Sequence, residues 1–237
     1  GFDDIYAEIR EGNTISQKVF TRAGYTLIGK EKKLIEDTGE TCDIISYVYN
    51  ITPPLIKNDG VFVIAEAGSN WRMGTNKRDL AMAKTLIDVA RDAGADAVKF
   101  QTYRPEKVYV KNAGKSDYLS NANIKEDITD IFADLAMPYD MLPELAAYCE
   151  SNGILFMSTP FSVEDFEAID PYVSVHKLAS YELSHLRLIE HIAKTKKPLI
   201  MSTGASGYDN IAWALKTYYD NGGITPALLQ CTAQYPA

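Results

Sequence analysis

Charged and polar side chains recur at the ends of short apolar segments along this chain. Glu66 ends one such segment, Lys99 and Lys177 lie near the ends of two others, and Ser202 ends a fourth. Because side chains alternate between the two faces of a strand, Lys99 shares a face with Gln101. A lysine with apolar neighbours on both sides is costly to bury unless a counter-charge meets it. The pattern therefore predicts a pocket in which Glu66 and an anionic ligand offset the two ammonium groups.

Hydroxyl groups follow the same segments. The donors suited to phosphate or carboxylate are Ser158, Ser180, Ser202 and Thr203. Glu182 adds a second carboxylate that can offset lysine charge. Hydroxyls ahead of Gly204, at the start of an expected helix, predict an anion cradle of exposed amide N–H groups. An alternative stays open for Ser158 and Thr203, because Ser and Thr also cap helices or pair with other polar groups.

Apolar segments rich in β-branched residues predict the strands that position these groups. We expect buried strands at residues 61–67, 96–100, 154–158, 173–178, 198–202 and 226–231. Helical patterns lie between them, at residues 77–93, 129–135, 139–152, 163–169, 184–195 and 207–221. Residues 103–128 predict a long polar loop of the kind that is functional or mobile. The alternation indicates an α/β protein with a parallel sheet.

The unit spacing of roughly 25 to 45 residues fits a doubly wound sheet or a (β/α)8 barrel. No Gly-x-Gly-x-x-Gly signature follows residues 61–67, which weakens the dinucleotide-binding alternative. A TIM barrel accounts better for polar side chains at nearly every strand end. About six βα units are visible, so we expect an incomplete barrel over residues 61–237 that stops about two units before closure.

The amino-acid composition limits the classes of binding partner that we expect. A net charge of -8 over 237 residues argues against nucleic acid and anionic membranes. The three cysteines match no disulfide or zinc spacing and suit a reducing cytoplasm. We find no signal peptide and no apolar run of about eighteen residues or more. The sequence therefore predicts a cytoplasmic protein that binds small molecules.

Residues 1–50 do not follow the βα rhythm. They predict strands at 4–10, 25–29 and 44–49 and a helix at 15–22, and the Pro-rich segment 51–60 predicts a linker. Asn13, Ser16 and the Gly24-Tyr25 pair resemble the C-terminal part of a GNAT-type acyltransferase. The Gly-rich turn that cradles coenzyme A in that family is not present in these residues. The alternative is a small α/β appendage without catalytic function.

Six motifs in order carry a more specific resemblance. They are IAEAGSN (64–70), VKFQT (98–102), FMSTPF (156–161), HKLASYE (176–182), KPLIMSTG (197–204) and LQCTAQYP (229–236). They resemble the N-acetylneuraminate (sialic acid) synthase family, including its pseudaminic and legionaminic acid branches. The resemblance implies a TIM barrel that condenses phosphoenolpyruvate with an N-acylated hexosamine, such as N-acetylmannosamine or a relative. The products would be a nonulosonic acid and phosphate.

The resemblance also implies roles for individual residues. The phosphate and carboxylate of phosphoenolpyruvate would be held by Lys99, Lys177, Ser180 and Ser202. The sugar would be contacted by Gln101 and Tyr235. Glu66 would transfer a proton at the reacting carbons, and Glu182 would position the sugar or water. Trp71 and Ala233 replace a histidine and an asparagine of some members, which leaves the acceptor sugar open.

The family implies a divalent metal, Mn or Mg, that polarises the aldehyde oxygen of the sugar. Its two histidine ligands lie on later strands, so we assign no metal ligand in this chain. His176 is next to Lys177 and should face away from the barrel interior, and His185 and His191 are too far apart on one helix to pair. The chain by itself should bind metal poorly, and the missing strands would leave it inactive.

Two other functions stay open. A Schiff-base aldolase of the TIM-barrel class also needs a lysine at a strand end and a carbonyl substrate. A non-catalytic phosphosugar-binding or assembly module is favoured because an open barrel leaves strand edges that a partner must cover. The synthase family often completes its sugar site with a domain of a second subunit, which implies a homodimer.

Overall fold

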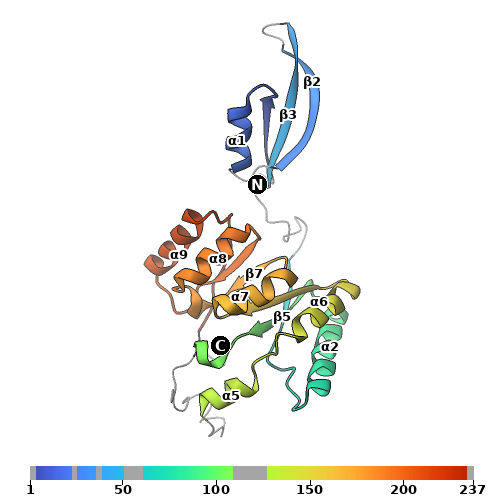
Figure 1. Ribbon diagram of the computed structural model, residues 1–237, viewed down its shortest axis with the longest axis vertical. Coiled ribbons are helices and arrows are strands. Elements are labelled where there is room, and N and C mark those ends of the chain that lie inside the picture. Colours follow the sequence, from blue (N-terminus) through green and yellow to red (C-terminus); the bar gives the residue numbers. More distant parts are fainter. Residues whose placement is uncertain (1–3, 23–25, 36–38, 51–60, 109–126, 234–237) are drawn as a thin grey trace. The chain divides into compact units, whose positions relative to one another are not determined.

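The computed structural model in Figure 1 describes residues 4–22, 26–35, 39–50, 61–108 and 127–233. The chain divides into two compact units, residues 1–61 and residues 62–237, and each is described by itself. The predicted linker at 51–60 lies outside the described residues. All the predicted site residues except Tyr235 fall in the described part of the second unit.

The first unit is a three-stranded antiparallel sheet with one helix. Its elements are β1 (Asp4–Arg10), α1 (Thr14–Arg22), β2 (Thr26–Ile35) and β3 (Glu40–Asn50). The strand order is β1-β3-β2, so β3 lies in the centre and pairs with both neighbours. Asn13 starts α1, because its side-chain oxygen accepts a hydrogen bond from the Ser16 amide at 3.1 Å. The predicted order of strand, helix, strand and strand is confirmed.

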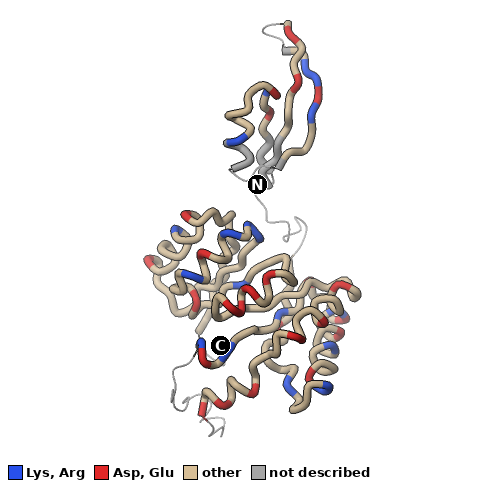
Figure 2. Tube along the Cα trace, in the orientation of Figure 1, with Lys and Arg blue, Asp and Glu red and all other residues tan. Residues whose placement is uncertain are grey.

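Two strands of this unit are longer than predicted. β2 continues through a run of charged residues that shows no apolar alternation, and Figure 2 shows these charges following one another along the strand. Lys30 pairs with Glu11 at 2.7 Å and Lys33 pairs with Glu8 at 2.5 Å. Such exposed pairs add little stability, but they allow a charged segment to serve as an edge strand.

The second unit alternates strands and helices. Its strands are β4 (Ile64–Gly68), β5 (Ala97–Thr102), β6 (Leu155–Pro160), β7 (His176–Leu178), β8 (Leu199–Ser202) and β9 (Ala227–Leu229). Its α-helices are α2 (Asn76–Asp92), α3 (Pro105–Val108), α5 (Ile128–Asp134), α6 (Met141–Ser151), α7 (Val163–Ile169), α8 (Leu186–Thr195) and α9 (Tyr208–Asp220). Two 3₁₀ turns are η1 (Asp170–Tyr172) and η2 (Ser180–Glu182).

The strands form two parallel sheets, β4-β5-β6 and β7-β8-β9, and β6 lies beside β7. Strand order therefore follows chain order, which confirms the predicted α/β alternation. Among the described strands no pairing joins β9 back to β4, so closure of a barrel is not seen. In the same part of the chain, no helix has both the length and the apolar character needed to cross a membrane.

Helices bury one face of each sheet. Ala83, Ile87 and Ala90 of α2 pack with the first sheet, as their helical spacing predicts. The second sheet packs against α8 and α9, which lie side by side in Figure 1. Trp71 is also buried in the first cluster, with 1% of its surface exposed. This position is therefore part of the core beneath the strand ends.

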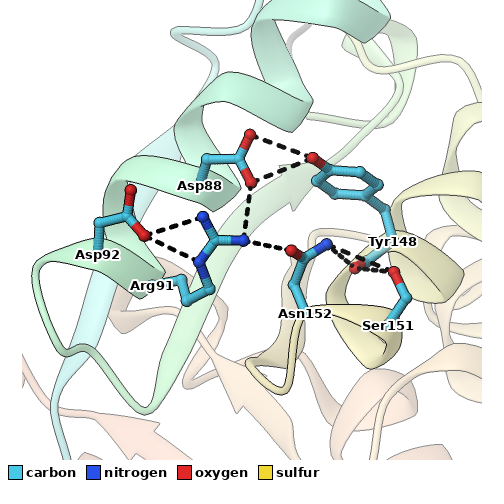
Figure 3. A network of polar contacts seen from close by, with 6 residues as sticks. All are labelled: Asp88, Arg91, Asp92, Tyr148, Ser151 and Asn152. Atoms are coloured by element: carbon cyan, nitrogen blue, oxygen red, sulfur yellow. Dashed lines mark hydrogen bonds and ion pairs between the residues drawn. The ribbon is translucent and has the colours of Figure 1, made fainter.

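A polar network on the outer surface joins α2 to α6, and Figure 3 shows its six residues. Arg91 donates to Asn152 and pairs with Asp88 and Asp92, while the Tyr148 hydroxyl donates to Asp88 at 3.1 Å. Its ion pairs are partly exposed, so the network fixes the relative position of the two helices more than it stabilises them.

Several element boundaries differ from the prediction, including the starts of β4, β7 and α8. The expected loop 103–128 contains the short helix α3, which begins at Pro105, where a missing N–H costs nothing; residues 109–126 lie outside the described part. β7 is three residues shorter at its start, because η1 occupies the preceding turn. α8 begins at Leu186, because the His185 ring accepts the Leu188 amide at 3.2 Å and caps the helix.

Asp79 offers a test of how α2 holds the segment that follows β4. Its carboxylate is 3% exposed and accepts hydrogen bonds from Arg72 at 2.7 Å and from the Met73 amide at 2.6 Å. We expect Asp79→Ala to lower the free energy of unfolding by about 2–3 kcal/mol, because it leaves both donors without that acceptor. Denaturant unfolding measures the change. The control Asp92→Ala removes a carboxylate that is 69% exposed; an equal loss in both variants would contradict the assignment.

Candidate functional site

The C-terminal ends of β4 and β5 bring a carboxylate and an ammonium group together. Glu66 and Lys99 are register partners in these parallel neighbours, and their side chains form a direct ion pair. The Lys99 side chain is 12% exposed, whereas the Glu66 side chain is 47% exposed. A mostly buried ammonium group is thus paired with a carboxylate that solvent and ligands can reach.

Gly68 makes room for this pair and for Gln101. Its φ of +54° lies in the left-handed region, which L side chains rarely adopt. A Cβ atom at this position would lie 3.3 Å from the Glu66 carboxylate and 3.9 Å from the Gln101 amide nitrogen. The turn after β4 therefore places Glu66 and Gln101 around the same point.

Lys177 is the buried cation of the second sheet. It is 7% exposed, and its Nζ donates to Ser202 Oγ at 2.6 Å and to the Leu178 carbonyl at 2.9 Å. Burial lowers the pKa of Lys177 and the Lys99 ammonium group lowers it as well, while Glu66 opposes the shift, so that the pKa is about 8. Two ammonium groups therefore share one nearby carboxylate, which leaves an excess of positive charge for an anion.

Ser180 and Gly204 join the ends of β7 and β8. The Gly204 amide donates to Ser180 Oγ at 3.0 Å. A Cβ at Gly204 would lie 3.0 Å from that oxygen and 3.1 Å from Cys231 Cβ, so a side chain at this position would require these neighbours to move by a few tenths of an ångström. The predicted helix-start cradle at Gly204 is wrong, since α9 begins at Tyr208 and the Gly204 N–H is already engaged.

Cys231 is a site residue that the sequence did not indicate as one. Burial raises the pKa of its thiol, but hydrogen bonds from Ser202, the Thr203 amide and Ser180, with the charge of Lys177, lower it overall. The thiol therefore lies among the hydroxyl groups of the anion pocket. Its place two residues beyond Leu229 in β9 was the available signal, because polar residues also follow the ends of the other strands.

We define the anion cluster as Glu66, Lys99, Gln101, Lys177, Ser180, Ser202 and Cys231. The structure brings these seven side chains together from β4, β5, β7, η2, β8 and the segment after β9. Parallel strands have all their carboxyl ends at one edge, which explains why residues distant in sequence meet here. The charge and the donors suit a ligand with phosphate or carboxylate groups.

Glu182 lies in η2, next to Ser180 in sequence but in a different environment. Burial, and to a smaller extent the Asp165 carboxylate, raise the pKa of Glu182 to about 7. Asp165 is itself fully buried and accepts hydrogen bonds from Tyr139 at 2.7 Å and Ser162 at 2.6 Å. No hydrogen bond or ion pair links Glu182 to Lys99 or Lys177 within the described ranges. Glu182 can therefore gain and lose a proton near neutral pH.

Two other predicted residues, Ser158 and Thr203, make contacts outside the anion cluster. Ser158 is buried, and its hydroxyl forms a hydrogen bond with the Thr102 hydroxyl at 2.8 Å. This agrees with the alternative that Ser158 pairs with another polar group. Thr203 donates to the Leu229 carbonyl at 3.0 Å and so links β8 to β9. Neither residue caps the helix that follows its strand. The N-cap of α7 is Ser162, and the N-cap of α9 is Gly207. Tyr235 lies outside the described residues.

The histidines have structural contacts. His176 is fully buried, contacts Phe166 on the helical side of β7 and pairs with Asp170 at 3.0 Å. His185 caps α8, and His191 hydrogen-bonds the Arg187 carbonyl at 2.7 Å. In the described ranges no three His, Cys, Asp or Glu side chains gather to hold a metal ion, so the residues do not fit one and we derive no step through a metal.

Known proteins resemble this chain mainly over its second unit. A family model described as the NeuB family matches residues 86–237. The Bacillus subtilis spore coat polysaccharide biosynthesis protein SpsE is 35% identical over 184 residues, covering 76% of this chain and 47% of that protein. A Campylobacter jejuni pseudaminic acid synthase is 31% identical over 179 residues, covering 74% and 50%.

The crystal structure of an N-acetylneuraminic acid (sialic acid) synthetase from Leptospira borgpetersenii, in complex with citrate, superposes with a TM-score of 0.63. It is 25% identical, and the match covers 88% of this chain and 61% of that one. The chain spans about half the length of the curated relatives that it matches. These similarities do not support the GNAT resemblance of residues 1–50.

The charge of Lys177 predicts how anion binding depends on pH. Because its pKa is about 8, the ammonium group is lost as the pH rises through that value. We expect the affinity for inorganic phosphate, measured by calorimetry, to fall about fivefold to tenfold between roughly pH 7.5 and 9. Lys177→Gln should bind weakly at every pH. Lys216→Gln, which removes a lysine that is 74% exposed, should keep the wild-type curve; a flat wild-type curve would refute the assignment.

His176 predicts the pH dependence of stability. Burial lowers its pKa to about 4, from 6.5 in an unfolded chain, although Asp170 opposes the shift. Below about pH 6.5 the unfolded state therefore binds a proton at this histidine that the folded state does not bind. The free energy of unfolding falls as the pH drops toward 4. We expect a slope of up to about 1.4 kcal/mol per pH unit in denaturant unfolding. His176→Gln should flatten this slope and His191→Gln should not; the reverse order would contradict the prediction.

Proposed function

Because this chain belongs to the NeuB family, we propose that the intact protein condenses phosphoenolpyruvate with an N-acylated hexosamine such as N-acetylmannosamine. The products are a nonulosonic acid and phosphate. The observation that supports this most is the convergence of the Lys99–Glu66 ion pair with the buried Lys177–Ser202 pair. The pocket has more positive than negative charge at a strand-end edge, where ligands of this fold bind.

The anion cluster suits an enol phosphate for electrostatic reasons. Lys99 and Lys177 repel each other, which contributes to the lowered pKa of Lys177. A ligand with both a phosphate and a carboxylate relieves that repulsion and holds Lys177 in its charged form. Ser180 and Ser202 add hydroxyl donors of fixed position. Phosphoenolpyruvate has both anionic groups within a few bonds of its reacting carbon.

In the proposed reaction, C3 of the enol attacks the aldehyde carbon of the open-chain sugar and forms the new C–C bond. The aldehyde oxygen takes up a proton, water adds at C2, and the phosphate leaves with cleavage of its bond to C2. Glu66 is exposed enough to reach the reacting carbons and is held in place by Lys99. We assign proton transfer there to Glu66 and the positioning of sugar or water to Glu182, whose pKa of about 7 permits acid–base exchange.

Gln101 lies beside Glu66 and can donate its amide to a sugar hydroxyl. The described residues do not fit a metal ion, so the Mn or Mg of the family stays an expectation that rests on the resemblance. The same is true of a TIM barrel with eight βα units and of a homodimer. No observation supports the expectation that the chain as printed is inactive.

The Schiff-base aldolase is the second candidate, and one observation favours it. Lys177 has a pKa of about 8, so a sizeable fraction of its amine is neutral and nucleophilic at physiological pH. Its engagement with Ser202 and the Leu178 carbonyl weighs against attack on a carbonyl. Trapping with borohydride separates the two functions, because only a Schiff base leaves pyruvate bound covalently to Lys177 or Lys99.

The synthase proposal predicts phosphate release when the intact protein meets phosphoenolpyruvate, manganese and a panel of N-acylhexosamines. Glu66→Gln and Lys99→Met should each lower kcat/KM at least about 100-fold, because they remove the proton carrier and an anion ligand. The control Lys84→Gln removes a lysine that pairs with Glu144 on the helical side of the unit and should keep full activity. Silence with every sugar, or equal effects of all three variants, would count against the proposal.

A further inference from the structure

The segment after β9 brings Cys231 to the end of β8. Ser202 and Leu229 are register partners at the ends of these two parallel strands. Both the Thr203 amide and the Thr203 hydroxyl donate to the Leu229 carbonyl at 3.0 Å. These contacts fix the chain two residues before Cys231, so the place of the thiol beside the anion cluster follows from strand register.

The immediate neighbours of Cys231 are groups that bind anions. A Cβ built on Gly204 would lie 3.1 Å from Cys231 Cβ and 3.0 Å from Ser180 Oγ, so the thiol and this hydroxyl lie on the same side of Gly204. Ser202 Oγ accepts a hydrogen bond from the buried Lys177 ammonium group at 2.6 Å, which leaves its own hydrogen for an acceptor beside it. The thiol therefore lies among two hydroxyl groups and a cation.

The other two cysteines have different surroundings. Cys149 is fully buried in α6, and burial raises the pKa of its thiol to about 12. Cys42 is partly exposed in β3 of the first unit, where its register partner Lys33 is already paired with two glutamates. Cys231 is partly exposed as well, and although burial raises the pKa of its thiol, its hydrogen-bond donors lower it overall. Its thiolate is thus both accessible and stabilised.

A thiolate at Cys231 also fits the charge balance of the anion cluster. The Glu66 carboxylate pairs directly with Lys99. Burial, and then the Lys99 ammonium group, lower the pKa of Lys177, whereas negative charge on Cys231 opposes this shift, as that on Glu66 does. Lys177 is therefore the cation that the thiolate faces, and it is also the cation that an anionic ligand would meet.

We propose that the Cys231 thiolate and an anionic ligand compete for the same donors of the anion cluster, so that a bound anion shields the thiol and a covalent group on the sulfur closes the site to anions. The shared donors are Ser180, Ser202 and Lys177. The inference rests on the anion binding of the proposed function, and it adds to that site a residue that sets its affinity.

Iodoacetamide tests this competition, because it is a small neutral electrophile that reacts with thiolates. The sulfur attacks the methylene carbon, a C–S bond forms, the C–I bond breaks and iodide leaves, while the proton of the thiol passes to the buffer. The carbamidomethyl group that stays on Cys231 then lies among the donors of the cluster. The step needs no oxidant, and the other two cysteines serve as internal references.

We expect alkylation of the intact protein, followed at each cysteine by mass spectrometry at about pH 7.5, to be at least about tenfold faster at Cys231 than at Cys42 and slowest at Cys149. Inorganic phosphate at about ten times its dissociation constant should slow the reaction of Cys231 about tenfold and leave that of Cys42 unchanged. Sodium chloride at the same ionic strength should not shield Cys231. Lys177→Gln should slow its alkylation, because the thiolate loses a counter-charge.

The affinity for phosphate gives the second measurement. After alkylation, calorimetry should show that inorganic phosphate binds the wild-type protein at least about tenfold more weakly. The matched control Cys42→Ser should lose affinity to the same extent, because it leaves Cys231 in place. In Cys231→Ser the affinity should be the same before and after treatment, whatever its absolute value.

The outcomes separate this inference from the synthase function. Mutual exclusion of phosphate and alkylation, without phosphate release from phosphoenolpyruvate with any sugar, supports the competition and overturns the synthase function. Phosphate release by the intact protein, with inorganic phosphate still bound at full affinity after Cys231 is alkylated, overturns the competition and leaves the synthase function standing. Equal alkylation rates at Cys231 with and without phosphate, or no binding of phosphate, also overturn the competition.

Discussion

The candidate site depends on one electrostatic constraint: two ammonium groups, Lys99 and Lys177, lie at buried strand ends, and among the described residues the carboxylate of Glu66 is the one close to both. Burying charge is costly unless it is paired, so the surroundings of each lysine are specific. Lys99 is satisfied by its register partner on β4, and Lys177 by a hydroxyl on β8 and a carbonyl of its own strand. The remaining positive charge favours the binding of an anion at this site.

The strand positions and the charged pair could be predicted because both follow from a period of two. An apolar segment that ends in Glu66 or Lys99 places the charged group at a strand end, and parallel strands bring their ends to one edge. The contact of Lys177 with Ser202, and those of Cys231 with the hydroxyl groups of Ser202 and Ser180, could not be predicted. They depend on register and on turn geometry between strands that are far apart in sequence. The raised pKa of Glu182 likewise depends first on burial and then on Asp165, which only the folded helix α7 brings near.

The elements and residues that the sequence-based prediction missed each have a local physical cause. The helix at Pro105 was missed because polar composition hides a single turn, and the extension of β2 was missed because its charges pair across the sheet instead of alternating with apolar residues. Ser158 was grouped with the anion ligands on residue type alone, although its hydroxyl is buried against Thr102. Side-chain chemistry therefore located the edge of the sheet well, whereas the identity of each free donor required the fold.

The absence of a side chain at Gly204 has a consequence for the energetics of any reaction here. Its amide donates to Ser180 Oγ, and a Cβ built on it would lie 3.1 Å from Cys231 Cβ, so the ends of three consecutive strands approach one another where a side chain would be tight. Dipoles held in this way are preorganised, and they do not need to reorient when negative charge develops on a bound molecule. A protein can thus keep its reorganisation energy low simply by omitting one methyl group.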